Sequence, residues 1–367
     1  MATLIKDLKI NIQSPFLNAN SSEKILFFDI ETTGFSAKTS KLYLIGGIYR
    51  FMGNWKIIQF FLDSDENEKD LLYDFMSFAS EYTLLISYNG TGFDTRFLWE
   101  KCQLLDVEYT LDNLTHFDIY KEISRYKPFF KLSHMKQKNI EEFLGVNRED
   151  QFDGGQLIQK YFDYIMTPND EDKKLLLLHN SDDLFGMIQI LSIVHYSKFF
   201  SGSFEIKKLS IDEYSNKDGE VQKEALFELS LHLPLEKRIS FGNDIFYITA
   251  SKKTAFMKVP ILKAEMKFFY PNYKDYYYLP QEDMAIHKSV AFYVDKDFKT
   301  KAKAANCYGK KSGEFLVQYE QIVSPYFKKE YNDKTSYFEL TNEFIRNPAK
   351  IKEYVLHIFK YLLKKQR

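Results

Sequence analysis

The chain has 367 residues, of which 45% are hydrophobic and 17% aromatic, so it can form sizeable cores and is not disordered as a whole. No apolar run reaches the roughly 18–20 residues of a membrane-spanning helix, and the first residues lack the pattern of a signal peptide. Two distant cysteines, Cys102 and Cys307, give no metal-binding spacing. They indicate reduced thiols in a cytoplasmic protein. Since the sequence has no membrane-spanning run, no membrane partner is expected.

The net charge of −1 hides an uneven distribution along the chain. Residues 1–200 contain 21 Lys and Arg against 29 Asp and Glu, whereas residues 201–367 contain 29 against 22. A basic half beside an acidic half is compatible with nucleic-acid binding and metal chemistry, respectively. Solvated lysine-rich surfaces would produce the same counts, so the charge alone leaves both interpretations open.

Residues 1–22 form a polar leader with one short strand at most. Three β-prone apolar runs follow, separated by Gly and Asn turns, at residues 24–31, 42–51 and 55–62. Their short spacing predicts three consecutive strands in an antiparallel meander. The segment 65–82 then places apolar residues at helical spacing after an acidic first turn, which favours a helix.

The chain continues with a short buried strand at residues 83–88 and a helix at residues 92–105. Residues 132–198 are predicted to be mostly helical, with Asn180-Ser181 as a candidate junction between two helices. A domain boundary is expected near residues 198–204.

Beyond this boundary, alternating segments predict the strands of a separate sheet, at residues 204–214, 225–235, 239–250 and 255–270. The chain closes with an amphipathic basic helix from Pro348, expected to dock on its own domain. Four lysines of this half are candidate phosphate contacts, with solvated surface as the alternative: Lys252, Lys253, Lys310 and Lys311.

The first motif with chemical content is ILFFDIETTGF, which contains Asp29 and Glu31. Side chains alternate along a strand, so both carboxylates face the same side and can bind metal ions together. Thr32, Thr33 and Gly34 then turn the chain and bring backbone close to the carboxylates. A strand that ends in solvated acids before a turn is the alternative for the isolated Asp-X-Glu.

The second motif is LLISYNGTGFD, in which Asn89 and Asp94 follow a buried strand. Asn-Gly is a turn signal, and Asn89 either forms the turn or lies near a bound strand end. Asp94 opens a helix, where a carboxylate is favoured by the helix dipole. Capping alone would account for Asp94 without a role in catalysis.

The third motif is LLLLHNSDDLFGM, which contains His179 and Asp183. Positions four apart share one face of a helix, so the two side chains point the same way. A histidine beside a metal-bound carboxylate suits proton abstraction from water. A surface His–Asp pair is the alternative.

Together these motifs resemble those of the DEDD superfamily of 3′–5′ exonucleases, which have the RNase H-like fold, and a bacterial group of RNase H-like domain proteins. The similarity covers about residues 24–196 and includes the stretches HFDIYKEI and KNIEEFLGVNREDQFDGGQLIQKYFDYI. It implies an α/β fold, in which an RNase H-like mixed sheet flanked by helices is followed by a separate α+β C-terminal domain. The domains would span residues 23–199 and 200–367.

The resemblance implies two divalent cations, Mg²⁺ or Mn²⁺, held by four acids: Asp29, Glu31, Asp94 and Asp183. It implies hydrolysis of DNA or RNA from a free 3′ end by a two-metal mechanism. Substrate contacts would come from Thr32, Thr33, Gly34 and Asn89.

His179 departs from the family pattern. The family places a Tyr with three intervening residues, or a His with four, before the last Asp; here a His has three. His179 is predicted as the catalytic base. A catalytically silent nucleic-acid-binding or scaffolding protein and a structure-specific endonuclease are the alternatives.

Overall fold

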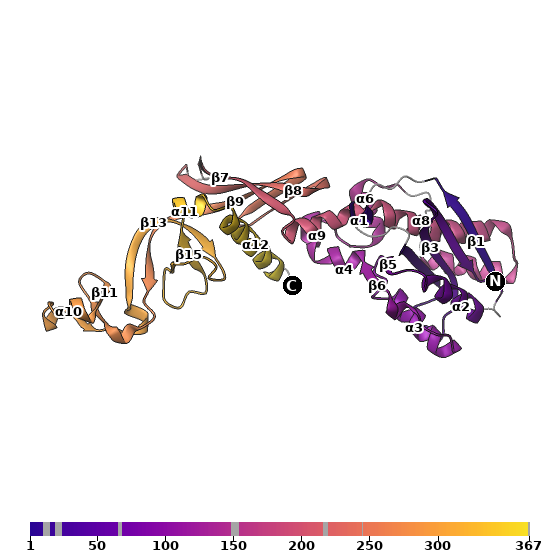
Figure 1. Ribbon diagram of the computed structural model, residues 1–367, viewed down its shortest axis with the longest axis horizontal. Coiled ribbons are helices and arrows are strands. Elements are labelled where there is room, and N and C mark those ends of the chain that lie inside the picture. Colours follow the sequence, from indigo (N-terminus) through magenta and orange to yellow (C-terminus); the bar gives the residue numbers. More distant parts are fainter. Residues whose placement is uncertain are drawn as a thin grey trace. The chain divides into compact units, whose positions relative to one another are not determined.

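The computed structural model describes most of the chain: residues 1–9, 15–18, 24–64, 68–147, 154–215, 219–243 and 245–365. These residues form two compact units, Met1–Ser197 and Lys198–Arg367, called unit 1 and unit 2 below. Each unit has its own sheet and its own helices (Figure 1). Part of the stretch used for the family resemblance, residues 148–153, lies outside the described residues.

Unit 1 contains a six-stranded mixed sheet in the order β1-β4-β3-β2-β5-β6. The strands are β1 Ala2–Leu8, β2 Ile25–Thr32, β3 Leu42–Phe51, β4 Asn54–Phe61, β5 Leu84–Ser87 and β6 Thr115–Asp118. β2, β3 and β4 pair antiparallel, which confirms the predicted meander. β5 and β6 extend the sheet in parallel to β2, because each is reached through a helical connection.

The N-terminal residues contain the one short strand that the sequence allowed. Residues 2–8, assigned from the sequence to a leader, form β1 and pair antiparallel with β4 over seven residues. The segment looks polar because its side chains are largely exposed on a sheet edge. An edge strand needs only one hydrogen-bonded neighbour, so it does not show the apolar run of a central strand.

The helices of unit 1 lie along the sheet and at its ends. They are α1 Pro15–Asn18, α2 Glu68–Ala79, α3 Asp94–Leu105, α4 Ile119–Ile123, α5 Lys127–Phe130, α6 Gln137–Leu144, α7 Gly154–Met166 and α8 Asp170–Gln189, and α9 Val194–Phe200 continues into unit 2. The expected junction at Asn180-Ser181 is wrong, because α8 runs through it without interruption. α8 packs against β2 and β3. The predicted mixed sheet flanked by helices is confirmed.

Alternation along β2 decides which side chains enter the core. Leu26, Phe28 and Ile30 join the main apolar core, where the ring of Phe28 stacks on Phe75 of α2. Asp29 and Glu31 therefore belong to the other face. The side chains of α8 reach both of them, so the polar face of β2 meets a helix instead of open water.

Unit 2 is rich in strands and forms the separate domain that was predicted to follow the first sheet. Its larger sheet has the order β14-β15-β13-β9-β8-β7, and a smaller one has the order β11-β10-β12. The strands of the larger sheet are β7 Phe204–Ser215, β8 Val221–Gly242, β9 Tyr247–Phe269, β13 Tyr308–Gln318, β14 Tyr326–Phe327 and β15 Ser336–Glu339. Those of the smaller sheet are β10 Tyr276–Leu279, β11 Met284–His287 and β12 Thr300–Lys301. The helices are α10 Lys288–Ala291, α11 Asn342–Ile345 and α12 Pro348–Lys365.

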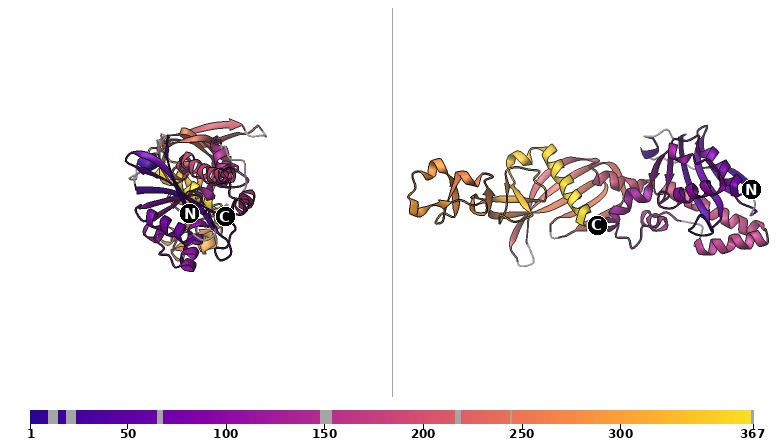
Figure 2. Two further views of the ribbon diagram at one scale, coloured as in Figure 1. Left: turned by 90° about the vertical axis from the view of Figure 1, so that its right-hand side faces the viewer. Right: turned by 90° about the horizontal axis from the view of Figure 1, so that it is seen from below.

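The helix α12 docks on its own unit, as expected (Figure 2). Its buried ring of Phe359 contacts Phe204 of β7, and Tyr354 contacts Phe227 of β8. Both cysteines are free, and both are buried. Among the described residues, no helix combines the length and the apolarity that crossing a membrane requires.

Candidate active site

The first two acids lie near the end of β2 and meet side chains from α8. The amide Nδ2 of Asn180 donates a hydrogen bond to Asp29 Oδ2 at 3.0 Å. His179 Nε2 lies 3.7 Å from Glu31 Oε1. The two carboxylates that share one face of the strand are therefore each met by a neighbouring residue of the same helix.

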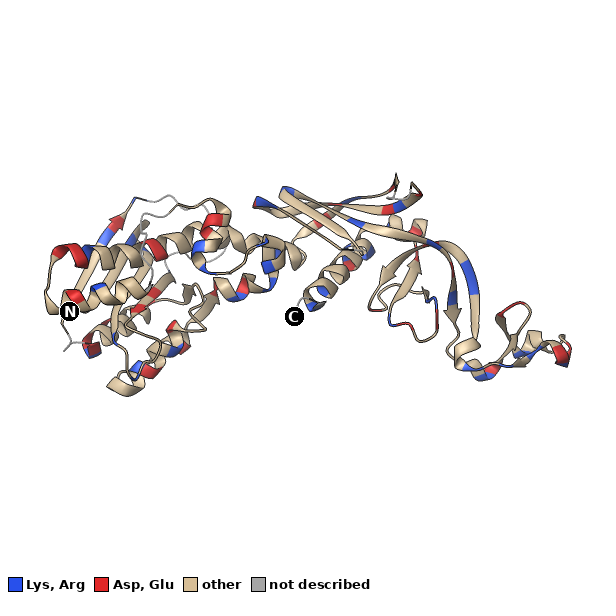
Figure 3. Cartoon of the chain, turned by 180° about the vertical axis from the view of Figure 1, so that it is seen from behind, with Lys and Arg blue, Asp and Glu red and all other residues tan. Residues whose placement is uncertain are grey.

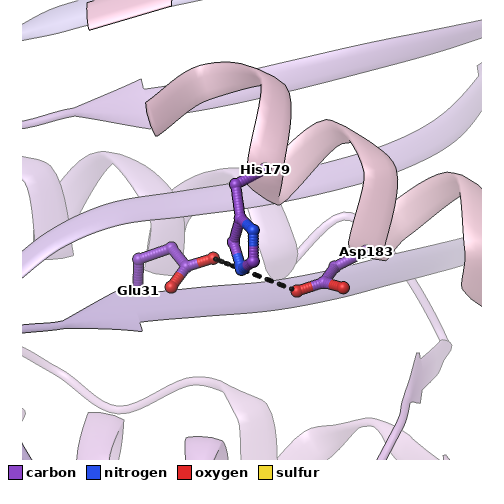
Figure 4. Close-up of side chains that lie close together, drawn as sticks. All are labelled: Glu31, His179 and Asp183. Carbon is purple, nitrogen blue, oxygen red and sulfur yellow. Dashed lines mark ion pairs between the residues drawn. The ribbon is translucent and has the colours of Figure 1, made fainter. Parts of the chain in front are cut away.

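A third acid comes from the next turn of α8 (Figure 4). His179 Nε2 is 3.4 Å from Asp183 Oδ2, as the spacing of four residues on a helix predicts. One ligand atom from each of Glu31, His179 and Asp183 lies within 4.8 Å of the others. His179 is buried, whereas the two carboxylates keep partial exposure. The imidazole thus separates two carboxylates that would otherwise repel each other.

Asp94 supplies the fourth acid from the first residue of α3. Its side chain is buried, and burial is the main reason that its pKa rises to about 7. Its own backbone N–H opposes this rise, while the negative charges of Asp118 and Asp183 add to it. A carboxyl group at the positive end of a helix would ordinarily ionise easily, so the surrounding acids and the lack of water outweigh the dipole here.

Asp29 is the residue on which the cluster converges. Burial raises the pKa of Asp29 well above its usual value, and the charges of three other acids raise it further: Asp183, Glu31 and Asp94. The hydrogen bond from Asn180 lowers it. All four acids predicted from the sequence therefore interact electrostatically. Among the described residues, the group whose ligand atoms lie within 4.8 Å of one another contains Glu31, His179 and Asp183 but not Asp29 or Asp94.

The donor set fits a hard divalent cation. Four carboxylates offer the oxygen ligands that Mg²⁺ and Mn²⁺ prefer, and one imidazole lies beside them. The raised pKa of Asp29 and of Asp94 points the same way, because a bound cation would offset both the burial and the repulsion that raise these values.

Sequence reasoning missed two residues behind Asp29. Gln59 of β4 donates from Nε2 to Asn180 Oδ1 at 3.0 Å and to the carbonyl oxygen of Leu177 at 2.9 Å. Both amide side chains are buried. These bonds leave the Nδ2 group of Asn180 pointing at Asp29, which fixes the orientation of the amide. A Cβ atom on Gly46 would lie 1.9 Å from Asn180 Oδ1, so the absence of a side chain there makes room for the contact.

The loop after β2 holds the first predicted substrate contacts. Thr32 Oγ1 donates to the carbonyl oxygen of Gly34 at 2.8 Å, and Thr33 Oγ1 accepts from the backbone N–H of Lys41 at 2.8 Å. Both hydroxyl groups thus stabilise the loop itself. Contact of Thr32, Thr33 and Gly34 with a substrate stays a prediction.

The turn after β5 carries Asn89 in the left-handed region, with φ of 64°. The carboxylate of Asp118 at the end of β6 accepts the backbone N–H groups of Asn89 and Thr91, at 2.9 and 3.1 Å. It also accepts from the backbone N–H of Lys121 and so caps α4. Asp118 was not singled out from the sequence, although it lies in the stretch HFDIYKEI; an Asp directly before a helical segment was the available signal.

A cavity of about 320 Å³ lies between the loop after β2 and the start of α3. Its lining includes Phe35, Phe93 and Arg96. Phe35 is 94% exposed, and its ring contacts Phe93 edge-on with the centroids 6.1 Å apart. Phe93 directly precedes Asp94 in the chain, so one wall of this aromatic cavity is one residue away from the acidic cluster, although none of the four acids lines the cavity.

Residues 26–194 match the family model of the RNase_H superfamily. Together with the mixed sheet described above, this match supports an RNase H-like fold for unit 1. A comparison with curated protein sequences gives no significant match.

Solved structures with partial similarity include a family B DNA polymerase from the archaeon Pyrobaculum calidifontis, with 16% identity and a TM-score of 0.39. That alignment covers 48% of this chain and 26% of the polymerase. Exonuclease I matches with 10% identity and a TM-score of 0.34, over 56% of this chain and 55% of its own. A metal-free complex of E. coli exonuclease I with single-stranded DNA matches with 9% identity and a TM-score of 0.33, over 57% and 54%. The chain thus spans about a quarter of the polymerase and about half of exonuclease I.

Proposed function

We propose that the protein is a metal-dependent nuclease that removes nucleotides from the 3′ end of DNA or RNA. The observation that carries this proposal is a group of four carboxylates in which burial and the charges of the other three raise the pKa of Asp29. The family match over residues 26–194 supports the same class of enzyme. Such clustering is unfavourable in a protein that holds no cation, which argues against a purely structural role.

Asp29, Glu31, Asp94 and Asp183 would hold the cations, Mg²⁺ or Mn²⁺. When bound, these ions lower the pKa of water and offset the negative charge of the phosphodiester. Asn180 would keep the Asp29 carboxylate in position through the 3.0 Å hydrogen bond from its amide. Asp118 would hold the turn that leads into Asp94.

His179 would accept a proton from the attacking water at Nε2. This atom lies between Glu31 and Asp183, 3.7 and 3.4 Å from their nearest oxygens, so both carboxylates would stabilise the imidazolium. The family pattern has a Tyr at this spacing. We therefore expect a His179→Tyr variant to keep more activity than His179→Ala.

The aromatic cavity beside the cluster would receive the terminal bases of the substrate. Phe35 is almost fully exposed, and unpaired bases stack on such rings regardless of sequence. Arg96 lines the same cavity and is paired there with Glu100 at 3.0 Å, so a phosphate would have to replace this partner. This arrangement favours a single-stranded end over an intact duplex.

The proposal can be tested with purified protein and with DNA and RNA strands that carry a label at the 3′ or the 5′ end. Each strand is incubated with the protein in the presence of either Mn²⁺ or EDTA. We expect Mn²⁺-dependent loss of the 3′ label as mononucleotides, abolished in Asp29→Ala and Asp183→Ala. Asp182→Ala is the matched control, because this acid neighbours Asp183 on α8 but lines a different cavity. It should retain activity.

Other results would replace the proposal. Binding of nucleic acid without any turnover, unchanged by EDTA, would identify a catalytically silent binding protein. Internal cuts in branched or hybrid substrates, with both end labels retained on fragments, would identify an endonuclease.

A further inference from the structure

Unit 2 presents a group of exposed apolar side chains beside its small sheet. Four large apolar residues within nine positions of the chain are exposed: Val290, Phe292, Tyr293 and Phe298, called the aromatic tip below. Phe292 is 80% and Tyr293 86% exposed, and their rings contact each other edge-on. Full burial of one such side chain would contribute roughly 1.5–3 kcal/mol, so their exposure does nothing for the stability of the unit. Exposed apolar groups of this kind commonly mark interaction sites.

The turn that carries the aromatic tip is held in a defined conformation. Lys299 Nζ donates to the backbone carbonyl oxygens of Ala291 and Val294, the latter at 2.6 Å. Backbone hydrogen bonds join Phe292 to Lys288 and Tyr293 to Val290. The small sheet beneath it closes over a core of its own, formed by Ala285, Ala302 and Cys307 with three tyrosines. The rings therefore project from a fixed platform, which lowers the entropy cost of binding.

The segment that carries the aromatic tip has an excess of lysines, although the exposed Asp295 and Asp297 flank Lys296. Residues 284–303 contain five lysines and two aspartates, and both kinds of charge are visible in this part of unit 2 (Figure 3). Four of the lysines are exposed, and one of these pairs with an aspartate. The other three are Lys296, Lys301 and Lys303. In contrast, two lysines suggested by the sequence are already engaged, since Lys310 pairs with Asp283 and Lys311 with Glu339, each at 2.6 Å.

We infer that the aromatic tip and these three lysines form a binding site for single-stranded nucleic acid in unit 2. Exposed rings can stack only on unpaired bases, and the lysines complement the charge of the phosphate backbone. The inference extends the proposed nuclease function, because it gives unit 2 a hold on the strand that is separate from the acidic cluster. It concerns binding alone and needs no cation.

Fluorescence anisotropy with labelled 30-nucleotide dT, rU and duplex DNA, measured in EDTA, would test the inference. We expect wild type to prefer the single strands and Phe292→Ser/Tyr293→Ser to bind them about fivefold or more weakly, as the removal of base stacking requires. The swap Phe292→Tyr/Tyr293→Phe keeps both rings and should keep the affinity. A variant that lacks two exposed tyrosines elsewhere, Tyr73→Ser/Tyr214→Ser, is the matched control and should bind as wild type does.

Lysine variants give a second measurement. Lys301→Gln/Lys303→Gln should flatten the dependence of log K on log salt by roughly 0.7 for each phosphate that is no longer neutralised. Unchanged affinity in the serine variant would overturn the inference while leaving the nuclease proposal intact. A second outcome would also overturn the inference: the serine variant binds phosphatidylserine vesicles more weakly than wild type does but binds single strands equally well. That result would identify a membrane-binding surface instead. If the wild-type protein binds single strands through the aromatic tip but shows no nuclease activity, only the proposed function is contradicted.

Discussion

Asn180 connects the interior of the sheet to the acidic cluster through one amide group. Its oxygen receives a hydrogen bond from Gln59, and its nitrogen donates one to Asp29. Residues that orient a metal ligand commonly change metal affinity or activity 10–100-fold when replaced. Asn180 therefore belongs with the four acids as a positioning residue, although it offers no ligand to a metal itself.

Asn180→Ala should weaken Mn²⁺ binding about 10–100-fold, because the Asp29 carboxylate would lose the amide that orients it. Gln59→Leu should act in the same direction but less strongly, since Asn180 could still reach Asp29. Isothermal titration calorimetry with Mn²⁺ would measure both. Gln318→Leu provides the control, because Gln318 is an equally buried glutamine in unit 2. Equal Mn²⁺ affinity in all three variants would show that the Gln59–Asn180 pair only supports packing.

The raised pKa of Asp94 predicts an unusual dependence of stability on pH in the absence of metal. Its pKa is about 7 in the folded protein, against a usual 3.8, so the folded state holds this proton more tightly than the unfolded state. The folded protein therefore loses stability as pH rises from about 4 through about 7, by on the order of 1–4 kcal/mol. Asp94→Asn cannot ionise and should escape this loss.

Thermal unfolding in EDTA between pH 5 and 8 would measure the effect. The unfolding temperature of Asp94→Asn should rise relative to wild type as pH increases, and added Mn²⁺ should cancel or reverse the difference. A difference that stays constant with pH would mean that Asp94 ionises as readily in the folded state as in the unfolded one.

For single residues, local spacing in the sequence predicted much of the acidic cluster. Asp29 and Glu31 follow from strand alternation, and His179 and Asp183 from helix periodicity. Asn180 did not follow, because Asn-Ser is locally typical of a helix end, and its partner Gln59 lies 121 residues away in the chain. Only the pairing of β4, β3 and β2 brings that glutamine beneath α8.

Among the helices and strands, the end of β6 stabilises two segments outside its own strand. The Asp118 carboxylate caps α4 and holds the turn between β5 and α3 through Asn89 and Thr91. Two segments separated by more than twenty residues thus depend on one side chain. The position of Asp94 depends on this turn, because α3 begins directly after it.

Asp118→Ala should lower the free energy of unfolding by about 2–4 kcal/mol, since a turn and a helix cap lose their buried acceptor together. Asn169→Ala should cost only about 1 kcal/mol, because Asn169 caps α8 without supporting a second segment. Urea denaturation would compare the two. Equal losses would contradict a role for Asp118 in holding the turn.

The strands of unit 2 show where sequence patterns mislead. The sequence predicts one strand at residues 225–235 and a second at 239–250. In the structure, the first continues past Pro234 as a single strand, β8, which ends at Gly242. Register shifts between Ser230 and Ile239 absorb the proline, and Lys252 on the facing strand adopts a positive φ of 52°. A bulge and a break leave similar signals in a sequence, so only the pairing partner distinguishes them.

For the whole molecule, the division into two units implies separate unfolding behaviour. Each unit has its own sheet and core, and the division falls within α9. A cation held by the acidic cluster would bind unit 1 alone. It should therefore stabilise only that unit, by about 2.7 kcal/mol at a free concentration one hundred times the Kd.

Differential scanning calorimetry of the intact chain should resolve two transitions, of which Mn²⁺ shifts one upward. Asp29→Ala should abolish that shift and leave the other transition unchanged. A single transition, or an equal shift of both, would show that the two units unfold together.

The missing side chain at Gly46 has a consequence for how this sequence can vary. A methyl group at position 46 would collide with Asn180 and with Leu184, so a substitution there forces a smaller residue at position 180. That replacement would in turn remove the hydrogen bond to Asp29. Among homologous chains that retain all four acids, positions 46 and 180 should therefore stay Gly and Asn together. In lineages that have lost an acid, both positions should be free to drift.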